Sequence, residues 1–162
     1  MTSKPSLRPG AEAPEFRLRG AGGVFYSLSE FRGEKHVLIA FFPLAFSPVC
    51  SHQLPELQAA LPKLEAADVT VLGISVDSHY ANAAFARSLG VTFPLLSDWN
   101  REASAAYGVL QTKANTSGRA LFLVDRRGRL LWSEISENPG SIEQIPSPER
   151  ALAALAAAAP RA

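Results

Sequence analysis

The amino-acid sequence predicts an α/β protein with a mixed central β-sheet flanked by helices. Two apolar runs, residues 36–42 and 69–76, are rich in β-branched and aromatic side chains. Their separation is typical of two parallel strands joined by a helix. A third run, residues 120–124, is followed by a turn and a return strand over residues 130–135, which indicates an antiparallel hairpin.

The N-terminal segment, which is rich in proline, glycine and alanine, predicts a surface arm that contains a short hairpin. We expect residues 16–18 to pair with residues 24–26 across the glycine-rich turn at 20–23. The fold class therefore includes an N-terminal hairpin in addition to the central sheet.

Leucines recur at helical spacing over residues 54–64, between the first two apolar runs. Pro55 and Pro62 lie inside this pattern, and each lacks an N–H and crowds the carbonyl four residues back. Two alternatives remain open. The helix is kinked, or it begins near Pro55 after a separate first turn that holds Cys50.

Capping residues mark a further helix over residues 79–89, with Asp77 or Ser78 as its N-cap and Gly90 at its end. A short helix is expected over residues 101–107, ended by Gly108.

A closing helix begins at Ser147-Pro148-Glu149, where serine is the cap and proline the first helical residue. The predicted order is β-α-β-α followed by β-β-α, which is the order of thioredoxin-like folds.

The chain has 162 residues, 47% of them hydrophobic, which suits one domain over residues 1–162. Its 16 basic and 15 acidic residues leave no broad positive surface, so we expect no nucleic-acid partner. No apolar run follows the N-terminus and none is long enough to cross a bilayer, which predicts a cytoplasmic protein without a membrane partner. We also expect no metal and no cofactor, because one cysteine and three histidines exclude a cysteine-rich zinc site.

Cys50, the one cysteine, lies where the first buried strand gives way to the next helix. Ligands bind at the carboxyl ends of strands in open α/β sheets, and the N-terminus of a helix favours thiolate over thiol. Ser47, three residues earlier, could place a hydroxyl beside the sulfur. The competing interpretation is that Cys50 is a small apolar core residue, as free cysteines often are.

The pattern Pro43-x-x-x-Ser47-x-x-Cys50 resembles the peroxiredoxin signature of proline, threonine or serine, and cysteine. Four further stretches resemble the family in the same order: residues 73–78, 93–98, 106–109 and 119–125. The run at residues 41–46 and the single cysteine are most similar to the one-cysteine alkyl hydroperoxide reductase E subgroup.

The resemblance implies a thiol-dependent peroxidase that reduces hydrogen peroxide and organic hydroperoxides through a sulfenic acid on Cys50. Ser47, the Cys50 backbone N–H and Arg119 would stabilise the charge that develops on the departing oxygen. Pro43 would shield the thiolate from water, and Gln53 would orient the arginine. An external low-molecular-weight thiol or a thioredoxin- or glutaredoxin-like protein would recycle the enzyme, which we expect to be a homodimer.

The sequence departs from the family at Ser47, where threonine is usual, and at Ser51-His52. We expect His52 to face solvent, which leaves a Cys–His hydrolase poorly supported. Asp77 either binds a cation or hydroxyl or, more commonly, caps the next helix. Two other functions remain open: a redox-sensing interaction protein whose oxidised cysteine signals to a partner without turnover, and a thioredoxin-fold binding protein with an inert cysteine.

Overall fold

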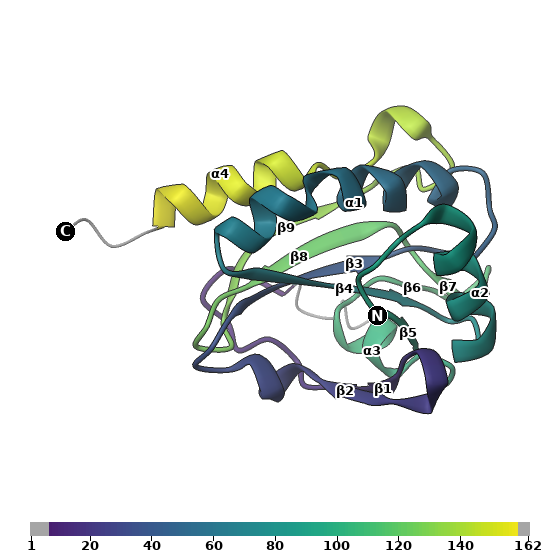
Figure 1. The fold of residues 1–162 in the computed structure, drawn as a ribbon, viewed down its shortest axis with the longest axis horizontal. Coiled ribbons are helices and arrows are strands. Elements are labelled where there is room, and N and C mark those ends of the chain that lie inside the picture. The colour runs from purple at the N-terminus through teal and green to yellow at the C-terminus, as the bar shows by residue number, and fades with distance from the viewer. Residues whose placement is uncertain (1–6, 159–162) are drawn as a thin grey trace.

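A computed structural model describes residues 7–158 and shows a central sheet between layers of helices (Figure 1). The strands are β1 (Arg17–Arg19), β2 (Phe25–Ser27), β3 (His36–Phe41), β4 (Val69–Ser75), β5 (Leu95–Ser97), β6 (Leu110–Gln111), β7 (Thr116–Ser117), β8 (Ala120–Val124) and β9 (Leu130–Ile135). The α-helices are α1 (Cys50–Ala66), α2 (His79–Leu89), α3 (Glu102–Ala106) and α4 (Pro148–Ala158). The 3₁₀ helices are η1 (Ala21–Gly23), η2 (Leu28–Phe31) and η3 (Ile142–Gln144).

The main sheet has the order β2-β1-β5-β4-β3-β8-β9. Strands β3, β4 and β5 run parallel, whereas β8 is antiparallel to both β3 and β9. The N-terminal hairpin pairs β1 with β2 and joins the sheet through Arg19 and Ser97. The predicted mixed sheet and its N-terminal hairpin are therefore confirmed, although each strand of the hairpin lies one residue further along the chain than predicted.

The β6–β7 pair forms a separate two-stranded sheet that the sequence analysis did not predict. Each of its strands has only two residues. A segment that short carries no alternation of apolar and polar residues from which a strand can be recognised.

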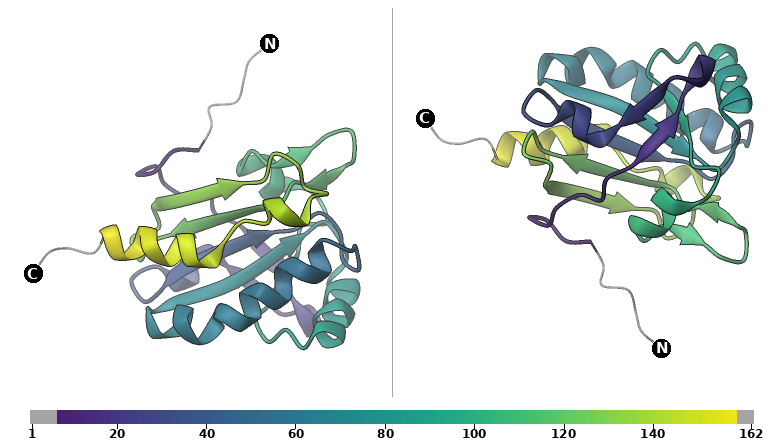
Figure 2. Two further views of the ribbon diagram at one scale, coloured as in Figure 1. Left: turned by 90° about the horizontal axis from the view of Figure 1, so that it is seen from above. Right: turned by 90° about the horizontal axis from the view of Figure 1, so that it is seen from below.

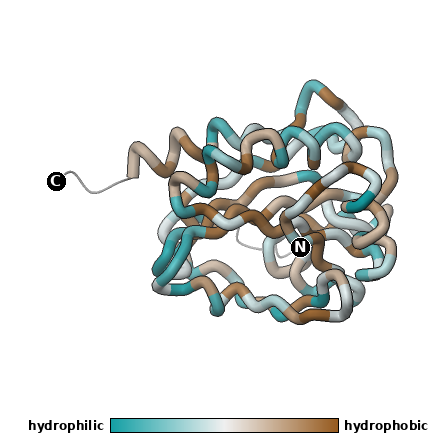
Figure 3. Tube along the Cα trace, in the orientation of Figure 1, coloured by the Kyte–Doolittle hydropathy of each residue, from teal (hydrophilic) through white to brown (hydrophobic). Residues whose placement is uncertain are grey.

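Successive residues of β3 supply the two sides of the core. Leu38 and Ala40 join the cluster beneath α1, α2 and α4, whereas Val37, Ile39 and Phe41 join the cluster that holds α3 and the N-terminal arm. This division follows from the alternation of side chains along a strand. Seen from above, α1 and α4 lie side by side over the strands (Figure 2), and hydrophobic residues concentrate between the layers (Figure 3).

Helix α1 begins at Cys50 and continues through both prolines. The alternative in which the helix begins near Pro55 is therefore wrong. A proline inside a helix costs about 3 kcal/mol, but burying a leucine side chain contributes about 1.5–3 kcal/mol. Leu54, Leu57 and Leu64 are all buried against the sheet, so their burial offsets the lost backbone hydrogen bonds.

Both ends of α2 and the end of α3 follow the capping signals. Ser78, not Asp77, caps α2, because its hydroxyl accepts the Ala81 N–H at 3.1 Å. Gly90 ends α2 and Gly108 follows α3, both in the left-handed conformation that glycine adopts without strain. Within residues 7–158, no helix has the length and apolarity that crossing a membrane requires.

Candidate active site

Cys50 is the first residue of α1, nine positions after β3 ends at Phe41, and it is completely buried. The first N–H groups of a helix have no intrahelical partner. No hydrogen bond from the Cys50 N–H to another group is found among the described residues. The sulfur therefore sits at a helix start whose backbone donor is unused.

Sheet pairing brings Arg119 to this helix start. Arg119 directly precedes β8, and the first residue of β8, Ala120, pairs with Phe41 at the end of β3. The Arg119 guanidinium donates from Nη1 to Cys50 Sγ at 3.2 Å. Residues 69 positions apart along the chain thus meet because β3 and β8 are antiparallel neighbours.

Arg119 is only 2% exposed, although it carries a full positive charge. Its Nη1 also donates to Gln53 Oε1 at 2.5 Å, and its Nε donates to the Pro139 carbonyl at 3.1 Å. No carboxylate of residues 7–158 forms an ion pair with it. A buried charge needs compensating partners, and the Cys50 sulfur is one of the three groups that face this guanidinium.

Gln53 lies one helical turn beyond Cys50 on the buried face of α1. Its side-chain oxygen accepts from Arg119, and its Nε2 makes a long contact of 3.5 Å with the Phe41 carbonyl. Gln53 thus connects the arginine to the end of β3.

The Ser47 hydroxyl is buried and forms no hydrogen bond with any residue that the structure describes, including Cys50. Its backbone carbonyl accepts the N–H and the hydroxyl of Ser51 at the start of α1. The residue is therefore fixed to the helix while its side-chain donor remains free. Pro43 lies half-buried at the other end of the same loop.

His52 is exposed and has no side-chain hydrogen bond within the described chain, which confirms the prediction that it faces solvent. Cys50 and His52 therefore do not form a Cys–His pair. Asp77, considered above as a cation ligand or helix cap, instead accepts the backbone N–H of Ala45 at 2.8 Å.

Two contacts of the site are not predicted by the sequence. The Ser117 hydroxyl donates to the Phe42 carbonyl at 3.0 Å, and the Pro139 carbonyl receives the Arg119 Nε–H. Both involve backbone carbonyls, whose positions depend on how distant segments pack. No residue pattern in the sequence signals them.

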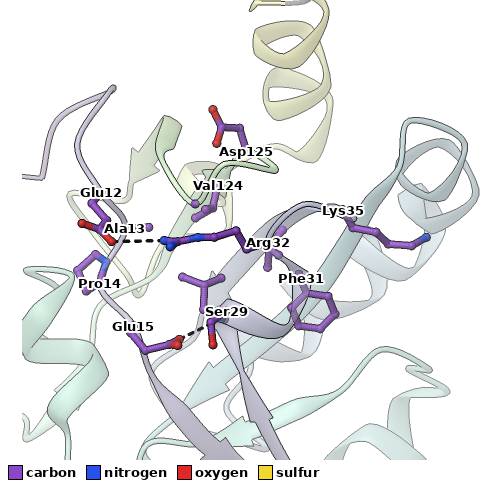
Figure 4. A pocket seen from close by; sticks show the side chains of 13 residues that line it. Glu12, Ala13, Pro14, Glu15, Ser29, Phe31, Arg32, Lys35, Val124 and Asp125 are labelled. Carbon is purple, nitrogen blue, oxygen red and sulfur yellow. Dashed lines mark hydrogen bonds and ion pairs between the residues drawn. The ribbon is translucent and has the colours of Figure 1, made fainter.

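A cavity of about 310 Å³ lies at the opposite end of β3 from Cys50 (Figure 4). Val37 and Val124 form part of its wall, and Arg32 donates to Glu12 at its mouth. Neither Cys50 nor Arg119 lines this cavity, so it is separate from the thiol site.

The model of the AhpC/TSA family matches residues 9–133. The chain belongs to the AhpC/TSA family. The predicted resemblance to peroxiredoxins is thereby confirmed. The matched residues contain Cys50, Arg119 and the loop that connects β3 to Cys50.

Relatives and solved structures agree with the family assignment. The chain is 41% identical to alkyl hydroperoxide reductase E of Mycobacterium tuberculosis over 153 residues, which are 93% of this chain and 99% of that protein. It is 31% identical to a chloroplastic 2-cysteine peroxiredoxin of Chattonella marina var. antiqua, over 81% of this chain and 72% of that one.

Among solved structures, the reduced 2-Cys peroxiredoxin of Plasmodium vivax superposes with a TM-score of 0.80 at 31% identity, covering 92% of this chain and 94% of that one. AhpC of Mycobacterium tuberculosis superposes with a TM-score of 0.80 at 25% identity, covering 94% and 93%. The predicted thioredoxin-like fold of the peroxiredoxin type is confirmed.

Proposed function

We infer that the chain is a thiol-dependent peroxidase that reduces hydrogen peroxide and organic hydroperoxides at Cys50. The observation that carries this function is the buried Arg119 guanidinium, which donates to the Cys50 sulfur and has no carboxylate partner among residues 7–158. A cation in this place stabilises a thiolate in the resting protein. It also stabilises an anionic oxygen during the reaction.

The reaction forms one bond and breaks another. The Cys50 thiolate attacks one oxygen of the peroxide, an S–O bond forms, and the O–O bond breaks with its electron pair moving to the departing oxygen. That oxygen takes up a proton and leaves as water or an alcohol. The sulfur, oxidised by two electrons, becomes a sulfenic acid.

Donors that are already in place stabilise the departing oxygen most effectively, because they need not reorganise during the reaction. We assign this role to three donors: the Arg119 guanidinium, which contacts the Cys50 sulfur, the Cys50 backbone N–H and the Ser47 hydroxyl. The last two lack acceptors among the described residues, so they are free to bind peroxide oxygens. We assign Pro43 the role of shielding the thiolate from water and Gln53 the role of holding Arg119.

Recycling of the sulfenic acid needs a second thiol, and this chain has one cysteine. We propose that an external low-molecular-weight thiol or a thioredoxin- or glutaredoxin-like protein supplies it. The proposal includes a single domain over residues 1–162, a homodimer as the working assembly and a cytoplasmic location. One solved relative, an N-terminally modified peroxiredoxin of Plasmodium yoelii, is described as an artifactual octamer.

Purified protein tests this function. One equivalent of hydrogen peroxide should be consumed per chain, and the mass at Cys50 should rise by one oxygen. In a separate sample, a dimedone reagent should label Cys50 and so identify the oxidised form as a sulfenic acid. With an excess of a thiol reductant, the wild-type protein should turn over repeatedly, whereas Cys50→Ser should not. Full turnover by Cys50→Ser would refute the proposal, and one equivalent without turnover would indicate a sensor.

A further inference from the structure

The loop of residues 43–49, here called the cysteine loop, connects β3 to α1 and carries both Pro43 and Ser47. Phe46 in this loop has a φ of 66°, in the left-handed region. For a residue other than glycine, such a conformation is strained and persists only where the surroundings hold it. The shape of the cysteine loop therefore depends on contacts that it makes outside itself.

Two contacts hold the cysteine loop against α2 and the connection between β4 and α2. The Ala45 N–H donates to Asp77 Oδ2 at 2.8 Å, and the centroid of the Phe46 ring lies 5.0 Å from that of the Phe85 ring in α2. Among the hydrogen bonds of residues 7–158, that of Asp77 is the only one that ties this loop to the β4–α2 connection. Phe46 remains 57% exposed, so its packing is partial.

The Asp77 carboxylate is itself firmly placed. Its Oδ2 also accepts the Ser75 hydroxyl at 2.7 Å, and its backbone N–H donates to the same Ser75 oxygen at 3.2 Å. Ser75 and Asn82 are completely buried, and Asn82 donates to the Leu96 carbonyl at 3.1 Å. The carboxylate is thus anchored to the end of β4, and Ser78 takes the helix-capping role in its place.

We propose that Asp77 is a positioning residue for the reaction of Cys50. By holding the Ala45 N–H, it keeps the cysteine loop closed, with Pro43 and Ser47 in place at the buried thiol. This inference rests on the proposed peroxidase function. Loss of Asp77 should have two opposite effects: slower reaction with peroxide, because Ser47 is no longer placed, and faster reaction with a bulky thiol reagent, because the closed loop no longer covers the sulfur.

The experiment compares Asp77→Ala with Asp77→Asn and with Ser78→Ala in the full, reduced chain. Asparagine keeps an oxygen that can accept the Ala45 N–H, whereas alanine does not. Ser78→Ala removes the adjacent cap of α2 without touching the cysteine loop, and so controls for local destabilisation. Each variant is assayed for its second-order rate constants with hydrogen peroxide and with a bulky maleimide, and for its thermal unfolding.

Asp77→Ala should react about tenfold more slowly with hydrogen peroxide and about tenfold faster with the maleimide, the effect of losing one hydrogen bond to a charged group. Asp77→Asn should stay within about threefold of the wild type in both assays, since a neutral acceptor restores a weaker bond. Ser78→Ala should leave both rates near their wild-type values.

The proposal is overturned if Asp77→Ala leaves both rates unchanged or if Ser78→Ala reproduces both changes. If thermal unfolding shows that Asp77→Ala does not fold, Asp77→Ser, whose side chain is too short to reach Ala45, takes its place with the same expectations. Failure of the peroxidase function has a different signature. Wild-type Cys50 would then react with peroxide no faster than a free thiol, while the maleimide rates would still report on Asp77.

Discussion

Ser47 carries a hydroxyl that is buried without a hydrogen-bond partner in the described chain. Leaving a buried polar group unpaired costs about 1–3 kcal/mol, so the resting protein is destabilised by this residue. A peroxide oxygen that accepted the hydroxyl proton would remove that cost during the reaction. The unpaired donor thus links a stability penalty to the catalytic role that we propose for Ser47.

Substitution of Ser47 by alanine should separate these two effects. We expect the rate of Cys50 oxidation by peroxide to fall by about a hundredfold, as for loss of a donor to a developing oxyanion. The free energy of unfolding should stay constant or rise by up to about 1 kcal/mol, because an unpaired hydroxyl is removed. Stopped-flow oxidation and urea denaturation measure the two quantities.

Ser136→Ala is the matched control, because Ser136 carries another buried, unpaired hydroxyl in the described chain. It should stabilise the fold in the same way without slowing the oxidation. A Ser47→Ala protein that loses stability and keeps its rate would contradict the assigned role.

Arg119 combines charge with three hydrogen bonds, and lysine can reproduce only the charge. Arg119→Lys should therefore slow peroxide reduction by about tenfold and Arg119→Met by about a hundredfold or more. Steady-state peroxide consumption measures both, with Arg127→Lys as a control on an exposed turn residue. Equal rates for Arg119→Met and the wild type would exclude a role for the guanidinium.

At the scale of elements, β9 and the start of α4 are joined around Glu134. Its carboxylate receives two hydrogen bonds from Arg150 in α4, both 2.5 Å long, and the Ser147 N–H at 3.0 Å. The hydrogen bonds from Arg150 are the main reason that the pKa of Glu134 is lowered from its ordinary value of 4.5. The ionised carboxylate is thus the form that the folded protein stabilises.

A carboxyl group whose pKa is lowered by folding contributes stability above its unfolded pKa, and this contribution is lost as the pH falls through the folded pKa. Glu134→Gln should therefore reduce the free energy of unfolding at pH 7 by about 1 kcal/mol, a modest amount because Arg150 is largely exposed. The difference from the wild type should shrink as the pH falls below 4.5.

Urea denaturation at a series of pH values measures this difference. Glu143→Gln, which alters an exposed carboxylate without a hydrogen bond in the described chain, is the control and should show little effect. A difference between Glu134→Gln and the wild type that stayed constant with pH would contradict the linkage.

At the scale of the whole molecule, Tyr107 ties the N-terminal arm to the face of the sheet opposite α1. Its hydroxyl donates to the Pro14 carbonyl at 2.7 Å across 93 residues of sequence, and its ring packs on Phe41 and Phe122. Burial, with a smaller contribution from Glu15, raises the pKa of Tyr107 well above its ordinary value of 10.0. The hydroxyl therefore stays neutral in the folded protein.

Tyr107→Phe should lower the free energy of unfolding at neutral pH by about 1 kcal/mol, the net value of one hydrogen bond. Since the unfolded tyrosine ionises near pH 10.0 and the folded one does not, the wild type should lose stability above that pH. Tyr107→Phe should lose less, and Tyr80→Phe, at an exposed position, should behave as the wild type does. Identical alkaline unfolding of Tyr107→Phe and the wild type would contradict this account.

The continuity of α1 shows why local patterns leave some elements undecided. Pro55 weakens a helix wherever it lies inside one, so the sequence permitted a helix that began after it. Burial of Leu54, Leu57 and Leu64 beneath the sheet supplies the missing stabilisation. That contribution exists only once the sheet has formed, so residue spacing alone did not predict it.

Residue types alone indicate the strands and the helix caps, because burial and backbone conformation depend on side-chain chemistry. They also give the order along the chain of Pro43, Ser47, Cys50 and Arg119. The amino-acid sequence was therefore sufficient for the fold class and the family, and it pointed to Cys50 as the thiol to which we assign the reaction. The tertiary structure decided that Arg119 lies 3.2 Å from the Cys50 sulfur, that Pro139 holds the guanidinium and that Asp77 holds the cysteine loop. These contacts join distant segments, and two of them involve backbone atoms. Every residue has the same backbone carbonyl, and nearly every residue has the same N–H, so residue types do not show which of these groups will meet a given side chain in the folded protein.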